Sequence, residues 1–144
     1  MSPDGQRLAV TVLDLSRDIW VFDLLHGGEE RLRRDGRNEG PVWTPDGRRI
    51  AFGSDRVEAN RFDLYWQAVD GGAAELLKES ETVFLFPFSF SPNGDLLLYQ
   101  NGEDNDPRSI HLLSMDGDHA SQLLIATSSE EWGARTGAFR TTSA

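Results

Sequence analysis

Three histidines are the side chains of this chain that are best suited to transfer protons near neutral pH. His111 stands in an apolar run at the place that Trp20 and Tyr65 take in two similar runs, which predicts a packed, structural ring. His26 and His119 stand near glycines, where a turn with a solvated side chain is expected. None of the three histidines is therefore predicted to be catalytic.

Sequence signatures of the common enzyme classes do not occur in the chain. It has no Gly-x-Ser-x-Gly nucleophile turn, no Walker phosphate loop, no kinase signature and no His-Glu-x-x-His zinc motif. It also has no cysteine, which excludes disulfides, thiolate metal sites and a cysteine nucleophile. We therefore predict a protein that is not an enzyme and that uses no cofactor.

Acidic side chains gather in two short stretches, at residues 102–106 and 116–118. Carboxylate oxygens suit Ca²⁺, but a competent site needs about six to eight oxygen ligands, and neither stretch has the full EF-hand pattern. We expect solvated acidic loops and no metal site. Calcium binding by the 102–106 loop is the alternative.

Composition describes one ordinary globular domain. The 144 residues are 38% hydrophobic and 26% charged, and the formal net charge is −10. A negative charge of this size keeps a protein soluble and disfavours nucleic acid and anionic membrane surfaces, because both attract clustered Lys and Arg. We expect no nucleic-acid partner and no membrane association.

One four-residue turn occurs three times, which is the strongest signal in the sequence. The copies are Ser2-Pro3-Asp4-Gly5, Thr44-Pro45-Asp46-Gly47 and Ser91-Pro92-Asn93-Gly94. Pro presets the first central position of a type I turn, and Gly then takes a left-handed conformation before the next strand. Repeats of roughly 40–50 residues are typical of four-stranded propeller blades.

Each turn is followed by the same series of short strands. The first strands cover residues 7–12, 49–53 and 95–100, the second 18–23, 63–70 and 109–116, and the third 30–33, 74–77 and 121–125. Residues 41–43 and 86–90 lead into the next turns. Several strands are apolar on both faces, as in residues 19–22, so both faces must be covered by neighbouring sheets. The sequence predicts an all-β, partial β-propeller of about three four-stranded antiparallel blades.

The Ser-Pro-Asp-Gly turn, the Asp18-Ile19-Trp20 strand and the Trp43-Thr44-Pro45-Asp46-Gly47 junction resemble the TolB-like, WD-repeat-like β-propellers. The resemblance is to propellers of the kind appended to bacterial serine/threonine kinases and prolyl-oligopeptidase-like peptidases, and it covers about residues 2–135. It implies a fold and leaves function open, because this fold serves many unrelated tasks. The chain has no signal peptide as written, which predicts a cytoplasmic protein, although such relatives often function outside the cytoplasm.

The expected propeller domain spans residues 1–135. Its blades cover about 2–34, 37–80 and 82–126, with a final strand at 130–135 and a disordered tail at 136–144. Three blades do not close a ring, since propellers typically have about four to eight. Two chains joined end to end would give about six blades, with Glu131, Trp132 and Arg135 at the junctions. A homodimer is therefore the expected homo-oligomer.

The family resemblance places the loops between blades, and those between the first and second strands of each repeat, on one rim of the channel. We therefore expect ligand contacts from polar residues of these loops, namely Arg37, Asn38, Glu39, Asp55, Arg56 and Arg61. The predicted function is a non-catalytic binding module for a peptide or protein segment. Two alternatives are a sensor or gating piece split from a kinase or peptidase, and a folded gene fragment with no evolved task.

Overall fold

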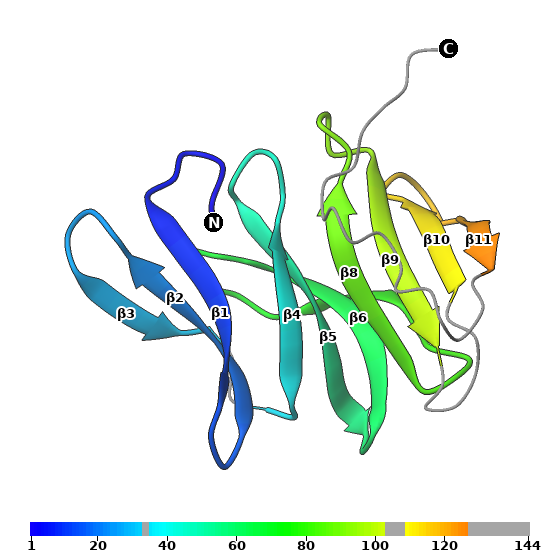
Figure 1. The fold of residues 1–144 in the computed structure, drawn as a ribbon, viewed down its shortest axis with the longest axis horizontal. Helices are drawn as coiled ribbons and strands as arrows, with labels where there is room; N and C mark the ends of the chain where they lie inside the picture. The colour runs from blue at the N-terminus through cyan, green and yellow to red at the C-terminus, as the bar shows by residue number, and fades with distance from the viewer. Residues whose placement is uncertain (33–34, 103–108, 127–144) are drawn as a thin grey trace.

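The computed structural model describes residues 1–32, 35–102 and 109–126, and their strands form three groups that follow one another in sequence order along the long axis of the molecule (Figure 1). The all-β prediction is confirmed. A first sheet contains β1 (Arg7–Leu13), β2 (Arg17–Asp23) and β3 (Gly28–Arg31); a middle group contains β4 (Asn38–Trp43), β5 (Arg49–Glu58), β6 (Arg61–Ala68) and β7 (Glu75–Lys78); and a last group contains β8 (Phe84–Phe90), β9 (Leu96–Gly102), β10 (Ser109–Ser114) and β11 (Ser121–Ala126).

Neighbouring strands within each group pair in antiparallel fashion. The middle and last groups are joined by one parallel bridge, between Phe62 of β6 and Phe84 of β8. We refer to the three groups as the first, middle and last sheets.

The repeated turn has the same geometry in all three copies. In the second copy, the Thr44 hydroxyl donates to Asp46 Oδ1 at 2.6 Å, and the backbone N–H of Gly47 donates to the Thr44 carbonyl at 2.9 Å. Gly47 has a φ of 69°, the left-handed conformation that favours glycine. Equivalent bonds form in the first and third copies, so the predicted turn chemistry is confirmed.

Successive turns also touch one another. A Cβ on Gly47 would lie 3.5 Å from Cδ of Pro3, and a Cβ on Gly94 would lie 3.7 Å from Cδ of Pro45. The proline of one turn therefore rests against the glycine of the next. This contact repeats from the first sheet to the middle sheet and from the middle sheet to the last.

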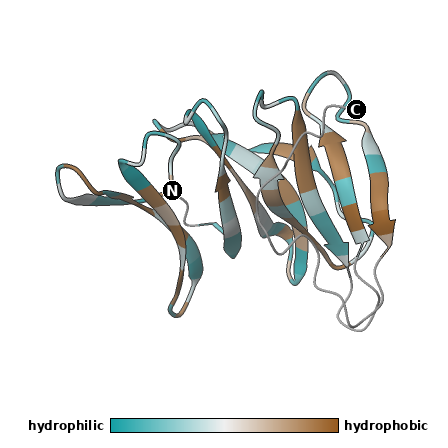
Figure 2. Cartoon of the chain, turned by 45° about the horizontal axis from the view of Figure 1, so that its top comes forward, coloured by the Kyte–Doolittle hydropathy of each residue, from teal (hydrophilic) through white to brown (hydrophobic). Residues whose placement is uncertain are grey.

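The sheets are held together by two apolar clusters, and hydrophobic residues gather on the strands (Figure 2). One cluster joins the first and middle sheets and includes Ile19, Trp43 and Phe52. The other joins the middle and last sheets and includes Leu64 and Leu97. The middle sheet is thus buried on both faces, as the two-sided apolar strands predict. Burial of this apolar surface is the main stabilising term of the fold.

The middle and last sheets approach most closely at Gly53. A Cβ at this position would lie 2.6 Å from the Phe86 ring and 2.8 Å from the carbonyl oxygen of Leu85. A glycine is therefore required at this point of β5 because a larger residue would overlap β8. The approach fixes the distance between the sheets beside the pocket described below.

Two segments predicted as loops are partly strands. Asn38 and Glu39 lie in β4, and Asp55 and Arg56 lie in β5. β5 continues past an irregularity after Ser54, and the ladder resumes with the pair Glu58–Arg61. The connection to β6 is therefore a tight turn, with Asn60 at a φ of 66°.

The predicted final strand at 130–135 and the tail at 136–144 lie outside the described residues. Nothing in the described part of the chain forms a helix of the length and apolar character that crossing a membrane requires.

Candidate functional site

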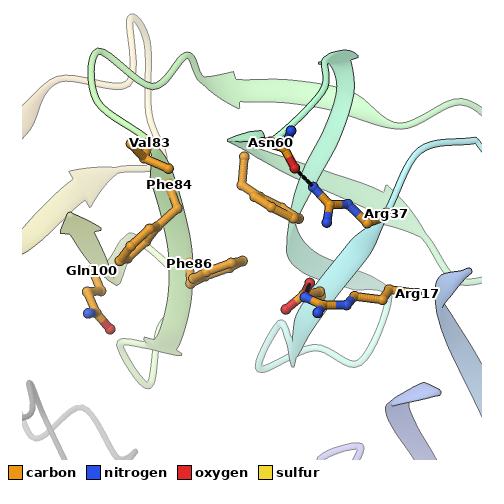
Figure 3. A pocket seen from close by; sticks show the side chains of 9 residues that line it. Arg17, Arg37, Asn60, Val83, Phe84, Phe86 and Gln100 are labelled. Atoms are coloured by element: carbon orange, nitrogen blue, oxygen red, sulfur yellow. Dashed lines mark hydrogen bonds and ion pairs between the residues drawn. The ribbon is translucent and has the colours of Figure 1, made fainter. Parts of the chain in front are cut away.

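A pocket of about 380 Å³ lies between the middle and last sheets. On one side, Arg17 reaches in from β2 of the first sheet and Arg37 from the residue just before β4, while the aromatic side comes from β8 (Figure 3). The pocket is lined by Arg17, Arg37, Glu39, Asn60, Phe62, Val83, Phe84, Phe86 and Gln100. Its volume is at the low end of ligand pockets, which span about 300–1,000 Å³.

Arg37 is fixed at one wall of the pocket. Its Nε donates to Asp55 Oδ2 at 2.8 Å, its backbone N–H donates to Asp55 Oδ1 at 2.6 Å, and its Nη2 donates to Asn60 Oδ1 at 2.6 Å. The guanidinium also lies over the ring of Phe62, with its Cζ 5.2 Å from the ring centroid. These contacts hold the guanidinium in one orientation with its side chain 35% exposed.

Asp55 is the buried anchor of this arrangement, and its side chain is 7% exposed. Burial raises the pKa of Asp55, but hydrogen bonds from the Arg37 backbone and side chain and from the Asn60 backbone outweigh it, so the pKa lies below its ordinary value. The carboxylate is therefore ionised in the folded protein at neutral pH. It is fully engaged in holding Arg37 and the turn at Asn60.

Acid is expected to destabilise the fold partly through Asp55. Because the folded pKa is depressed, the ionised carboxylate stabilises the fold above its unfolded pKa of about 3.9, and this stabilisation is lost as the pH falls through the lower folded value. Urea unfolding at pH 7 and pH 3 should show a smaller pH-dependent loss in Asp55→Asn than in the wild type. Equal losses in both proteins would show that Asp55 is not an ionised anchor.

The second arginine of the pocket, Arg17, forms an ion pair with Glu39 through Nη1. Its side chain is 46% exposed, and that of Glu39 is 22% exposed. Both carboxylates beside the pocket are thus already paired with an arginine. Within the described residues, Nη2 of Arg17 and Nη1 of Arg37 have no hydrogen-bond partner.

Three phenylalanines form the apolar wall. The Phe84 and Phe86 rings stack with centroids 5.2 Å apart, and Phe62 is tilted against Phe86, also at 5.2 Å. Phe86 is held in place by the close approach of Gly53. Phe84 and Phe86 are half-buried, so parts of both rings face the pocket.

Gln100 of β9 is the polar residue on this aromatic side. It pairs with Phe86 in the ladder and is only 7% exposed. Its Nε2 is buried and has no hydrogen-bond partner. A buried donor without an acceptor costs roughly 1–3 kcal/mol, and here the cost falls on the folded chain because this nitrogen has almost no accessible surface.

The six rim residues predicted from the sequence divide into two groups. Arg37 and Glu39 line the pocket and Asp55 holds Arg37, so the structure brings these three together. Asn38 is fully buried, and its amide donates to the carbonyls of residues 35 and 36. Arg61 forms ion pairs with Glu58, Asp63 and Glu79 and does not line the pocket.

Arg56 is also an internal contact in this structure. Its side chain is 12% exposed, donates to Ser54 Oγ and Asn38 Oδ1, and lies over the Tyr65 ring with Cζ 4.2 Å from the centroid. Because Asn38 and Arg56 lie in strands and point into the protein, their geometry favours a structural role.

The residues that the sequence analysis missed are Arg17, Asn60, Phe62, Val83, Phe84, Phe86 and Gln100. Three of them, Arg17, Phe84 and Phe86, had a usable signal. Arg17 follows the first strand of its repeat, as Asp55 does in the next repeat, and the alternating aromatics from Phe84 predict one aromatic face of a strand.

The histidines lie away from the pocket. His111 is half-buried and stacks on Tyr99 with centroids 5.3 Å apart, as predicted, and burial together with the charge of Lys78 lowers its pKa. His26 is exposed and contacts Asp23, also as predicted. The solvated reading of His119 is wrong, because its ring is half-buried and its Nδ1 lies 3.0 Å from the Ser114 carbonyl oxygen.

The predicted junction residues Glu131, Trp132 and Arg135 lie outside the described residues, as does the acidic loop apart from Gly102. Among the described ranges, no group of three or more His, Asp or Glu side chains is arranged to hold a metal ion.

Comparison with known proteins shows the family. Residues 1–134 match the family described as the TolB beta propeller domain. The uncharacterized protein Atu1656 of Agrobacterium fabrum is 33% identical in an alignment that covers 85% of this chain and 44% of that protein. The uncharacterized peptidase YuxL of Bacillus subtilis is 31% identical, over 74% of this chain and 18% of that protein.

A solved TolB structure from Agrobacterium tumefaciens superimposes with a TM-score of 0.76 at 30% identity, over 86% of this chain and 47% of that one. The chain thus spans less than half the length of each of these proteins. The repeated turns, the stacked sheets and a family match over nearly the whole sequence agree with one another, and the chain belongs to the TolB β-propeller family.

Proposed function

We propose that this chain is a non-catalytic binding module and that a peptide or protein segment enters the pocket between β4 and β8. The observation that carries the proposal is a preformed pocket with one aromatic wall and one wall of fixed hydrogen-bond donors. Such pockets bind apolar side chains through the aromatic wall and orient them through a few polar groups. Peptides supply both kinds of group at a fixed spacing.

The residues that line the pocket also support a role in binding without catalysis. They include no Ser, Cys, Lys or His that could act as nucleophile or proton carrier. The carboxylate among them, Glu39, is paired with Arg17 and so is poorly placed to act as a general base. We expect a bound peptide to be held and released unchanged.

The test is selection of peptides from a random display library on the full 144-residue chain. We expect enriched peptides whose affinity falls at least tenfold in Phe84→Ala and Arg37→Ala, because these changes remove the aromatic wall and the fixed guanidinium. Mass spectrometry of the selected peptides after incubation should find them intact.

Two matched variants separate local from general effects. Arg49 resembles Arg37 in exposure. It also forms an ion pair, in this case to Glu75, and lies over an aromatic ring, that of Trp66, but it does not line the pocket. Phe88 lies half-buried on the same strand as Phe84. Arg49→Ala and Phe88→Ala should bind normally. Equal losses in pocket and control variants, or no enrichment at all, would refute the proposed site.

The likeness to the peptidase YuxL supports a second candidate, a segment that gates access to a peptidase domain. This candidate makes a different prediction about the selected peptides. A gating segment predicts that the peptides bound by this chain are also substrates of such a peptidase domain. A pure interaction module predicts that the bound peptides are not cleaved by it.

We also propose that the 144-residue chain associates with a second copy of itself. Among the described residues β1 pairs only with β2, so its other edge can accept a strand. The turn-to-turn contact supports the same arrangement, because Pro92 is exposed and no described atom lies within 4 Å of a Cβ on Gly5. Pro92 of one copy would then rest on Gly5 of the other, as Pro45 rests on Gly94.

Light scattering coupled to size-exclusion chromatography measures this association directly. We expect a mass near twice the 16.1 kDa of one chain. Pro92→Glu should shift the protein toward the monomer, because a charge would enter the proposed contact. Ala73→Glu, which adds the same charge at an exposed position between β6 and β7, is the control. A monomeric wild type would contradict the proposal.

A further inference from the structure

We propose that residues 130–135 of one copy add to the free edge of β1 in a second copy as an antiparallel strand. This inference deepens the proposed self-association and rests on it. It names the segment that crosses between the copies and the register in which that segment pairs. It follows from the way in which the chain covers the same edge in its other two sheets.

The free edge of β1 has a covered counterpart in each of the other two sheets. β1, β5 and β9 each follow one copy of the repeated turn, so Leu8, Ile50 and Leu97 occupy equivalent places. β4 pairs along β5 and β8 pairs along β9, whereas among the described strands β1 has a partner on its β2 side only. Ile50 and Leu97 are fully buried, but Leu8 is only half-buried. An added strand would therefore cover apolar surface and pair with the unpaired backbone groups of β1.

The two covering strands are irregular at equivalent places, which allows residues 130–135 to be aligned with them. The ladder of β4 shifts after Glu39, where Gly40 takes a φ of 67°, and that of β8 shifts after Pro87. Gly40 and Pro87 each stand four residues before the Thr or Ser that opens the next turn. Gly133 is the glycine of residues 130–135. Because the left-handed conformation favours glycine, we match Gly133 to Gly40.

Spacing along the chain supports the same alignment. In each sheet, one residue of the outer strand pairs with the ring-bearing residue of the strand before it, and these residues are Arg31, Leu76 and Leu123. Glu39 of β4 follows the first of them by eight residues, and Phe86 of β8 follows the second by ten. Trp132 follows the third by nine residues. Trp132 therefore stands where the next covering strand is expected.

The alignment defines the register on β1. Glu39, the counterpart of Trp132, pairs with Gly53, and Gly53 stands at the place that Thr11 has in β1. The ladder between β8 and β9 leads to the same register. Trp132 is thus placed opposite Thr11 of the second copy. A tryptophan at a junction between chains is typical of an interface anchor.

Glu131 takes a buried place in this register. Its counterparts are Asn38 in β4 and Leu85 in β8, and both are fully buried. A carboxylate is costly to bury at such a place without a cationic partner. The register therefore predicts that removal of this charge strengthens the association, which a segment outside the interface would not do.

Disulfide cross-linking tests the register, because the chain has no cysteine of its own. In this register Arg135 lies opposite Ala9, and their counterparts Val42 and Ala51 form such a pair in the middle sheet. Cysteines directly opposite each other on antiparallel strands are within reach of a disulfide. We expect mild oxidation of a mixture of Ala9→Cys and Arg135→Cys to join two chains, and neither variant alone to do so. A mixture of Ala73→Cys, at an exposed position between β6 and β7, with Arg135→Cys is the control and should stay unlinked.

Two results of this experiment would overturn the inference. One is a mixture that forms no linked pair although the wild type is a dimer. The other is an Ala9→Cys/Arg135→Cys double variant that closes its disulfide within a monomer, because the segment would then lie on β1 of its own chain.

Glu131→Leu tests the register through a gain of affinity. The change removes the buried charge, so we expect the dissociation constant of the dimer to fall by about tenfold or more. Glu130→Leu is the matched control, because Glu130 takes the place of Arg37 and Phe84, which are only half-buried, and its charge can stay in contact with water. Sedimentation equilibrium measures both constants. Equal tightening in the two variants, or none in Glu131→Leu, would overturn the place given to Glu131.

The outcomes also separate this inference from the proposed self-association. If the wild type is a dimer and neither the cysteine mixture nor Glu131→Leu responds, the copies associate through another surface, and only the strand addition is refuted. If the wild type is a monomer, both are refuted.

Discussion

Replacement of Gly53 by alanine is expected to lower the free energy of unfolding by about 2–3 kcal/mol. The new Cβ would lie 2.6 Å from the Phe86 ring and 2.8 Å from the Leu85 carbonyl oxygen. The ring can turn only by giving up its stacking on Phe84, and the carbonyl belongs to the backbone of β8. The middle and last sheets must therefore move apart, which should also weaken binding in the pocket. Urea unfolding and peptide titration measure the two effects.

Gly28→Ala is the matched control for this change. Gly28 lies in β3, has no positive φ and has no atom within 4 Å of the added Cβ, so its replacement should change stability by less than about 0.5 kcal/mol. Equal stability of the two variants would show that the sheets are not in close contact at Gly53.

Loss of the Arg56 side chain is expected to cost about 3 kcal/mol of stability without changing peptide affinity. The stacking on Tyr65 and the hydrogen bond to Asn38 would disappear, and Asn38 Oδ1 would be left inside the protein without this donor. Thermal unfolding of Arg56→Ala, followed by peptide titration below its midpoint, measures both quantities.

The exposed Arg48 provides the comparison, because Arg48→Ala should be nearly neutral for stability. Arg37→Ala should show the reverse pattern to Arg56→Ala, with a larger effect on peptide affinity. If Arg56→Ala folded normally but lost peptide binding, Arg56 would be a ligand contact as the sequence analysis first placed it.

The sequence predicts the strands well because their signals are local. Each Ser/Thr-Pro-Asp/Asn-Gly turn forms its hydrogen bonds within four residues, as between Thr44, Asp46 and Gly47, and the strand that follows it begins close to the predicted residue. The two-sided apolar runs also predict correctly that the middle sheet is covered on both faces.

The pocket is harder to predict because its lining comes from five strands and the segments beside them. Arg37 and Arg56 look alike in the sequence, and only the irregular extension of β5 after Ser54 decides that Arg56 points inward. Gln100 follows an apolar run, so the sequence predicts an exposed polar residue at the end of a strand. Its burial arises because β8 and β10 pair with β9 on either side. These features depend on how distant segments pack together.

Mapping the binding site of a display-selected peptide by two-dimensional NMR tests the central claim most directly. The side-chain amides of Gln100 and Asn60 provide signals inside the pocket, and that of Gln67 provides one outside it. We predict that titration with the peptide shifts the signals of Gln100 and Asn60 most strongly and leaves Gln67 in place. Shifts centred instead on the β2–β3 turn, with Gln100 and Asn60 unchanged, would contradict the assignment of this pocket as the binding site.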